Sequence, residues 1–115
     1  TVGNGTLIGR YFRVGRTITF QINLTMGSTT TYGSGNYDFA LPVLAANVGT
    51  HHVGNVHVLA GPRYFGHVLV SPAGTTTSPF LANTSSQLVA MAQGTPVTLA
   101  SGNQIRITGV YEAAS

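Results

Sequence analysis

Two carboxylates, Asp38 and Glu112, are the only acidic side chains among the 115 residues of the sequence. Hydrolysis of a glycosidic bond generally uses two carboxylates held a few ångströms apart. The neighbouring residues place Asp38 on the polar face of one predicted strand and Glu112 at the end of another. Serine, histidine and aspartate all occur, but no Gly-x-Ser-x-Gly turn supports a catalytic triad. We therefore expect a protein that is not an enzyme, with an esterase or glycosidase as a weaker alternative.

Four histidines, at positions 51, 52, 57 and 67, are the next groups that could do chemistry. If Gly61–Arg63 is a three-residue hairpin loop, His57 lies directly opposite His67, on the outer face of the hairpin. Two such imidazoles can share one metal ion, so both are candidate ligands. We favour an ordinary cross-strand pair and expect neither a metal nor another cofactor. Histidines that meet at a trimer axis are a third alternative, and they would titrate between about pH 5 and 8.

Aromatic and neutral polar residues in predicted loops could bind sugars. Saccharides stack on aromatic rings, and neutral hydrogen-bonding groups satisfy their hydroxyls. Phe20 and Tyr111 alternate with polar residues in predicted strands, so we assign them to the core. The candidate ligand-binding residues in loops and at strand ends are Tyr32, Asn36, His52, Arg63 and Tyr64.

The charge balance excludes several classes of partner. Charged residues make up 6% of the chain, and five arginines, no lysine and two acidic residues give a formal net charge of +3. The arginines do not form one run, and binding to nucleic acid scales with the phosphates neutralised, so we expect no nucleic-acid partner.

No apolar run approaches the ~18 residues of a membrane-spanning helix, so we expect no membrane insertion. Without cysteine, the chain can form no disulfide.

Alternation of apolar and polar residues is the main structural signal, and it is clearest over residues 16–26. Ile18, Phe20, Ile22, Leu24 and Met26 fall on one side of that segment, as in a half-buried antiparallel strand. Glycine and proline mark turns about every 8–12 residues, which is typical of a sandwich or barrel. We predict a single all-β domain over residues 1–115, with loops at 27–35 and 71–78. The other predicted strands cover residues 9–14, 36–41, 52–60, 64–70, 97–100 and 104–112. Residues 79–82 are a short apolar segment, and residues 87–92 form a strand or a short helical turn, of which we favour the strand.

Both ends of the chain resemble a known family. Residues 9–20, GRYFRVGRTITF, resemble the G-x-Y-x-R-x-G-x-x-V-x-F opening of C-terminal domains in bacteriophage tail fibres and minor tail proteins. Residues 26–37 and the Phe-Ala-Leu-Pro segment at 39–42 resemble the middle of those domains. Residues 101–112, SGNQIRITGVYE, are similar to their last strand. These motifs occupy turn and core positions, so they transfer no binding residue.

The resemblance implies an antiparallel jelly-roll sandwich of about eight strands, similar to the C1q and TNF domains, that forms trimers. It implies a receptor-binding head at the tail tip of the virion, outside the cell, that recognises a bacterial surface saccharide. The low charge suits contact between subunits, where an unpaired charge would be costly.

Two alternatives are a purely structural trimerising tip without a ligand and a eukaryotic C1q-like or TNF-like signalling ligand. The signalling ligand is disfavoured by the lack of a disulfide and of a visible secretion signal. Because the sequence opens on Thr1, we expect a domain cut from a longer protein or a processed product. The resemblance implies that this domain is the C-terminal domain of a fibre protein.

Overall fold

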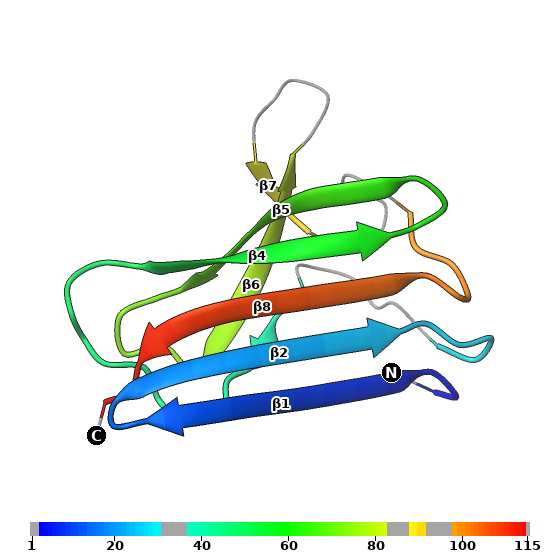
Figure 1. Ribbon diagram of the computed structural model, residues 1–115. Helices are drawn as coiled ribbons and strands as arrows, with labels where there is room; N and C mark the ends of the chain where they lie inside the picture. Colours follow the sequence, from blue (N-terminus) through cyan, green and yellow to red (C-terminus); the bar gives the residue numbers. More distant parts are fainter. Residues whose placement is uncertain (1–2, 31–36, 83–87, 92–97, 115) are drawn as a thin grey trace.

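The protein folds into antiparallel β-strands (Figure 1). The computed structural model describes residues 3–30, 37–82, 88–91 and 98–114. No helix occurs in these ranges, and so none there could cross a membrane. The strands are β1 (Thr6–Val14), β2 (Thr17–Thr25), β3 (Phe39–Ala40), β4 (His52–Leu59), β5 (Arg63–Val70), β6 (Thr76–Ala82), β7 (Leu88–Ala90) and β8 (Gln104–Glu112).

All eight strands belong to one curled sheet. Their order is β1-β2-β8-β4-β5-β6-β3, and β7 pairs with β6 beside β3. In Figure 1, β1, β2, β8, β4 and β5 lie side by side as a front layer, and β6 crosses behind them. β6 and the strands that pair with its other edge, β3 and β7, form the rear layer. The prediction of an all-β antiparallel domain with about eight strands is therefore confirmed.

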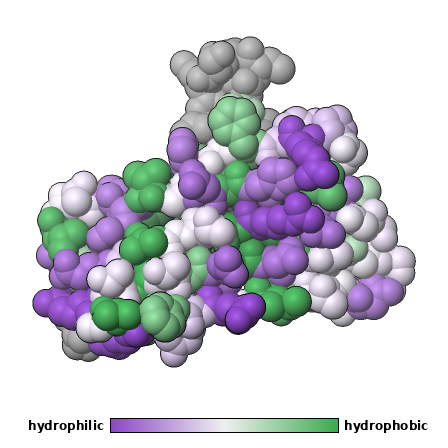
Figure 2. Space-filling model, in the orientation of Figure 1, coloured by the Kyte–Doolittle hydropathy of each residue, from purple (hydrophilic) through white to green (hydrophobic). Residues whose placement is uncertain are grey.

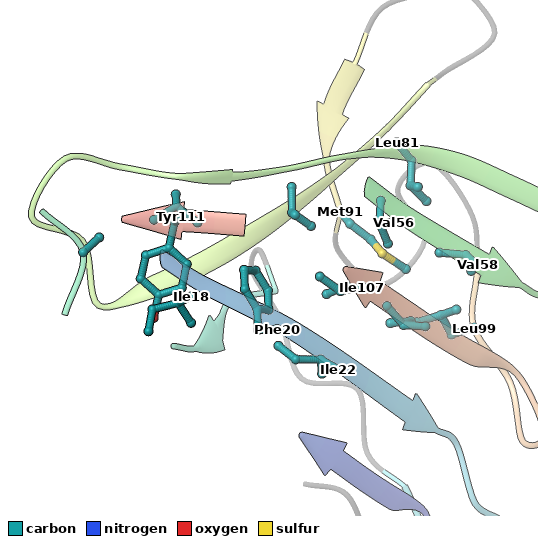
Figure 3. Packing of buried hydrophobic residues seen from close by; sticks show 14 of the residues in the cluster. Ile18, Phe20, Ile22, Val56, Val58, Leu81, Met91, Leu99, Ile107 and Tyr111 are labelled. Atoms are coloured by element: carbon teal, nitrogen blue, oxygen red, sulfur yellow. The ribbon is translucent and has the colours of Figure 1, made fainter. Parts of the chain in front are cut away.

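The core fills the space inside the curl. Ile18, Phe20 and Ile22 alternate with exposed Thr17, Thr19 and Gln21 along β2, as their period of two predicted. Figure 3 shows these side chains in one cluster with core residues from other segments, among them Leu81, Met91 and Tyr111. The residues that meet them from other segments include Val56, Val58, Val68, Leu81, Met91, Leu99, Ile105, Ile107 and Tyr111.

The sheet can curl because β5 and β6 approach each other closely at Gly66. Gly66 pairs with Leu81. A Cβ at position 66 would lie 1.9 Å from the carbonyl oxygen of Phe80 and 2.9 Å from the Cα of Leu81. Both neighbours belong to the backbone, so neither could rotate away. Glycine is therefore required where the front layer passes into the rear layer.

We expect Gly66→Ala to lower the free energy of unfolding by about 1–3 kcal/mol or more. The added Cβ would clash with the backbone of Phe80 and Leu81, and paired strands cannot move apart to make room for it. Urea denaturation followed by circular dichroism measures this. Gly9→Ala is the matched control, since a Cβ on that β1 glycine would have nothing within 4 Å. Equal effects of the two substitutions would contradict the close approach.

Pro79 lies inside β6, where the sequence predicted a loop up to residue 78 and only a short apolar segment beyond it. One edge of β6 pairs with β5, and the other pairs first with β3 and then with β7. Pro79 stands at the change of partner. Its carbonyl accepts from the Met91 amide, and the Met91 carbonyl accepts from the Tyr37 amide. The amide that proline lacks is thus not needed there.

Other predicted strands are shorter than expected. The segment 36–41 contributes only β3, and residues 98–100 form no strand although Leu99 is buried. In contrast, β8 begins and ends at the predicted residues, and β1 starts three residues earlier than predicted, at Thr6. The long, strongly alternating segments were predicted well, while the short ones depend on which neighbour they meet.

The Tyr111 side chain connects the end of β8 to the segment that follows β3 through hydrogen bonds to the backbone of Val43. Its hydroxyl donates to the carbonyl oxygen of Val43 at 2.7 Å and accepts from the Val43 amide at 3.1 Å. The ring is buried and meets the Phe20 ring edge to face, with centroids 5.7 Å apart. Burial raises the pKa of the Tyr111 hydroxyl above 10.0, although the hydrogen bond to the Val43 backbone opposes that shift.

We expect Tyr111→Phe to destabilise the domain by about 1–3 kcal/mol, because both polar groups of Val43 lose their partner. The wild type should also lose stability as the pH rises above about 10, since the unfolded chain releases the tyrosine proton more easily than the folded one. Urea midpoints at pH 8 and pH 10.5 measure both effects. An equally steep loss at high pH in Tyr111→Phe would show that another group causes it.

Candidate functional site

The structure does not bring the predicted ligand residues together. Tyr32 and Asn36 lie outside the described residues. His52 begins β4 and faces the interior, with its ring 6.4 Å from that of Tyr111. Arg63 and Tyr64 begin β5, at the opposite end of the β4–β5 hairpin. The three described candidates therefore form no common site.

His57 and His67 share the outer face of the β4–β5 hairpin, as predicted, but they are not directly opposite each other. Leu59 pairs with Arg63, which shifts the predicted register by two residues and leaves His57 opposite Phe65. The reason is the turn, which consists of residues 60–62 and is closed by a bond from the Ala60 amide to the Pro62 carbonyl. The predicted direct pairing was therefore wrong.

Each of these two imidazoles has its own partner. A guanidinium can only donate, so Nε2 of His57 accepts from Nη1 of Arg63 at 3.5 Å. Nδ1 of His67 donates to the carbonyl oxygen of Gly54 at 3.2 Å. Within the described ranges, no three side chains of His, Cys, Asp or Glu lie close enough together to hold a metal ion.

On the outer face of the front layer, side chains that are mostly polar lie in two rows that run across the strands. The register β1-β2-β8-β4-β5 defines both of them. The first row is Arg10, Gln21, Thr108, Asn55 and His67; the second is Ile8, Asn23, Arg106, His57 and Phe65. We call these residues the outer platform. Strands lie about 4.8 Å apart, so each row extends about 19 Å.

The outer platform is hollowed on both sides of Arg106 and Thr108. One open depression, of about 340 Å³, lies toward β1 and β2, and another, of about 300 Å³, lies toward β4 and β5. Arg106 and Thr108 line both depressions. Figure 2, which looks onto this face, shows hydrophilic and apolar side chains interspersed, with strongly hydrophilic ones over the right half of β8 and β4.

Arg106 is held in place at the centre of the platform. Its Nε and Nη2 donate to Oε1 of Gln104 at 3.1 and 2.8 Å. Beside it, the side-chain oxygen of Asn23 is buried and has no hydrogen-bond partner among the residues described. The platform thus presents an oriented cation next to an unsatisfied acceptor.

The platform carries positive charge without a carboxylate. Arg10 and Arg106 belong to it, and Arg63 flanks it through its contact with His57. Both acids of the chain are engaged elsewhere: Glu112 pairs with Arg16 at 3.2 Å, and Asp38 accepts a hydrogen bond from Ser78. Glu112 follows Arg106 by six residues along β8, or about 20 Å. No histidine takes part in the Ser78–Asp38 contact.

Phe65 is the aromatic residue that the sequence analysis missed. It is 73% exposed on the outer platform, whereas Tyr64 points inward and packs against the core. The signal was present in the sequence. Once His57 and His67 are assigned outward, strand alternation also turns Phe65 outward and Tyr64 inward.

We expect Tyr64→Ala to lower the free energy of unfolding by about 1–3 kcal/mol, because it leaves space at the edge of the core. Phe65→Ala should change it by less than about 0.5 kcal/mol, as is usual for an exposed position. Thermal and urea denaturation of the two variants measure this difference. A larger loss for Phe65→Ala than for Tyr64→Ala would reverse the assignment of the two rings.

A second surface lies along β1, where every residue is exposed. β1 forms one edge of the sheet and pairs with β2. Its partners in β2 place Leu7 and Tyr11 on the inner face of the sheet, yet these side chains are 53% and 58% exposed. A depression of about 280 Å³ lies beside Tyr11 and is also lined by Phe20, Leu41 and Pro42. The described residues therefore cover the inner face of β1 only in part.

Comparison with known proteins adds no relative: no family model, no curated protein and no solved structure matches the chain.

Proposed function

We propose that this chain is the receptor-binding head domain of a bacteriophage tail fibre. In this proposal it acts without catalysis at the tail tip, outside the cell, as a homotrimer that recognises a bacterial surface carbohydrate. The resemblance of residues 9–20 and 101–112 to such domains supports it. The curled antiparallel sheet is compatible with the jelly roll of C1q-like and TNF-like heads.

The single observation that carries the proposal is the uncovered β1 strand. Long edge strands with exposed apolar side chains tend to pair or aggregate unless something covers them. All nine residues of β1 are exposed, and five of them are large and apolar: Leu7, Ile8, Tyr11, Phe12 and Val14. On the inner face, the described residues leave more than half of the Leu7 and Tyr11 side chains exposed. A neighbouring subunit would bury them. Three copies in a closed ring would leave no β1 strand uncovered.

The outer platform supports the carbohydrate part of the proposal. Amide and hydroxyl side chains such as Gln21, Asn55 and Thr108 can both donate and accept, as sugar hydroxyls require. Phe65 adds an exposed ring on which a sugar could stack.

A purely structural trimerising tip is the second candidate. The position of Tyr64 favours it, because a predicted ligand-stacking residue packs against the core instead. The separation of His52 from Arg63 points the same way. Such a tip would form the same trimer but bind no glycan.

We expect a mass near three times 11.9 kDa when the domain is measured by light scattering from pH 5 to 8. Tyr11→Glu should reduce the mass to that of a monomer, because it places a charge in the subunit contact. Ser101→Glu, in the exposed turn before β8, is the matched control and should leave the trimer intact. A wild-type monomer or dimer at every pH would refute the trimeric head.

Binding of the trimer to an array of bacterial surface glycans separates the two candidates. Binding of a glycan supports the receptor-binding head. A trimer that binds none supports the structural tip.

A further inference from the structure

We propose that the outer platform binds an acidic saccharide, with a carboxylate or phosphate group on Arg106 and a sugar ring on Phe65. The inference deepens the proposed function and rests on it. It names the ligand class and the residues that would bind it, and neither follows from the resemblance to fibre domains.

The position of Arg106 argues for an anionic group. The guanidinium is half-buried between two depressions, and Gln104 fixes its orientation. A planar, oriented guanidinium suits carboxylate and phosphate groups, which accept two parallel hydrogen bonds. Because Glu112 pairs with Arg16 and Asp38 accepts from Ser78, no acidic side chain among the described residues pairs with Arg106.

The shape and composition of the platform argue for a saccharide. Each row extends about 19 Å across the five strands, a length suited to a short oligosaccharide. Between the charged positions stand Gln21, Asn23, Asn55 and Thr108, which match hydroxyls. The unsatisfied oxygen of Asn23 could accept from a ligand hydroxyl after rotation of its side chain.

Duplex nucleic acid fits the platform less well. The tertiary structure does gather Arg10, Arg63 and Arg106 on one face, although they are far apart in the sequence. Three arginines neutralise few phosphates, and affinity for nucleic acid depends on that number. The neutral amides between them contribute little to a duplex backbone but suit a sugar chain.

The two surfaces can act together. The acidic saccharide would lie on the outer face of the front layer, whereas Leu7 and Tyr11 are on the inner face of β1. A trimer built on the inner face would leave the outer platform accessible to the ligand.

Titration calorimetry of the assembled trimer tests the proposal with four probes. They are a tetrasaccharide of uronic acids, the same tetrasaccharide with its carboxyl groups reduced to alcohols, a phosphorylated tetrasaccharide and a short DNA duplex. We expect at least one acidic saccharide to bind roughly tenfold or more tightly than the reduced one, since a hydrogen bond to a charged group is stronger than a neutral one. Added salt should weaken that binding.

Arg106→Gln should weaken acidic binding by roughly tenfold and leave the reduced tetrasaccharide unaffected. Arg10→Gln should have a smaller effect of the same kind and serves as a second variant should Arg106→Gln fold poorly. Phe65→Ala should weaken both probes alike, because it removes stacking and no charge. Arg16→Gln is the matched control: it removes the same charge at the β1–β2 turn, where Arg16 pairs with Glu112, away from both the platform and the inner face of β1.

The outcomes separate this inference from the function it rests on. Equal binding of acidic and reduced saccharides, or tight acidic binding that neither Arg106→Gln nor Arg10→Gln weakens, overturns the acidic ligand while the carbohydrate-binding head stands. Tighter binding of the DNA duplex than of either acidic probe also overturns it. If these probes and the glycan array all fail to bind, both proposals fall.

Discussion

The close approach of β5 and β6 is the constraint on which the rest of the structure depends. Gly66 allows the Phe80 carbonyl to come so near that the sheet turns back on itself. The curl brings Leu81 of β6 over the inward side chains of the front layer and closes the core with one continuous sheet. A chain with few charges and no disulfide can close its core in this way, because burial of alternating apolar residues supplies the stability.

The same closure explains the two functional surfaces. Among the described residues, the inner faces of β2, β8, β4 and β5 are buried in the core, whereas β1 stays exposed along its length. No described segment covers the outer faces of the front strands, so their polar residues form the platform around Arg106. The face left for a neighbouring subunit and the face left for a ligand are thus opposite sides of one sheet.

Local alternation made much of the fold predictable. It identified β2 and β8 with nearly their observed bounds, and it turned His57 and His67 to the same face. It failed where structure depends on remote partners. Proline is tolerated at position 79 of β6 because the Pro79 carbonyl accepts from the Met91 amide, while the Met91 carbonyl accepts from the Tyr37 amide instead of from residue 79. Tyr64 was chosen over Phe65 as a candidate because loop position was weighed above strand alternation, although alternation turns Phe65 to the exposed face.

The sequence by itself predicted an all-β chain, and the structure has no helix in the described ranges. The sequence also determined that most of the few charged residues are arginines and that each long strand has one apolar and one polar face. Those properties are local, since each follows from composition or from a period of two. Which strands are neighbours is not local. Arg106 meets Asn23 on one side and His57 on the other through pairings that span about 50 to 80 residues, and these create the platform. Only long-range pairing, stabilised by burial of the core, selects that register.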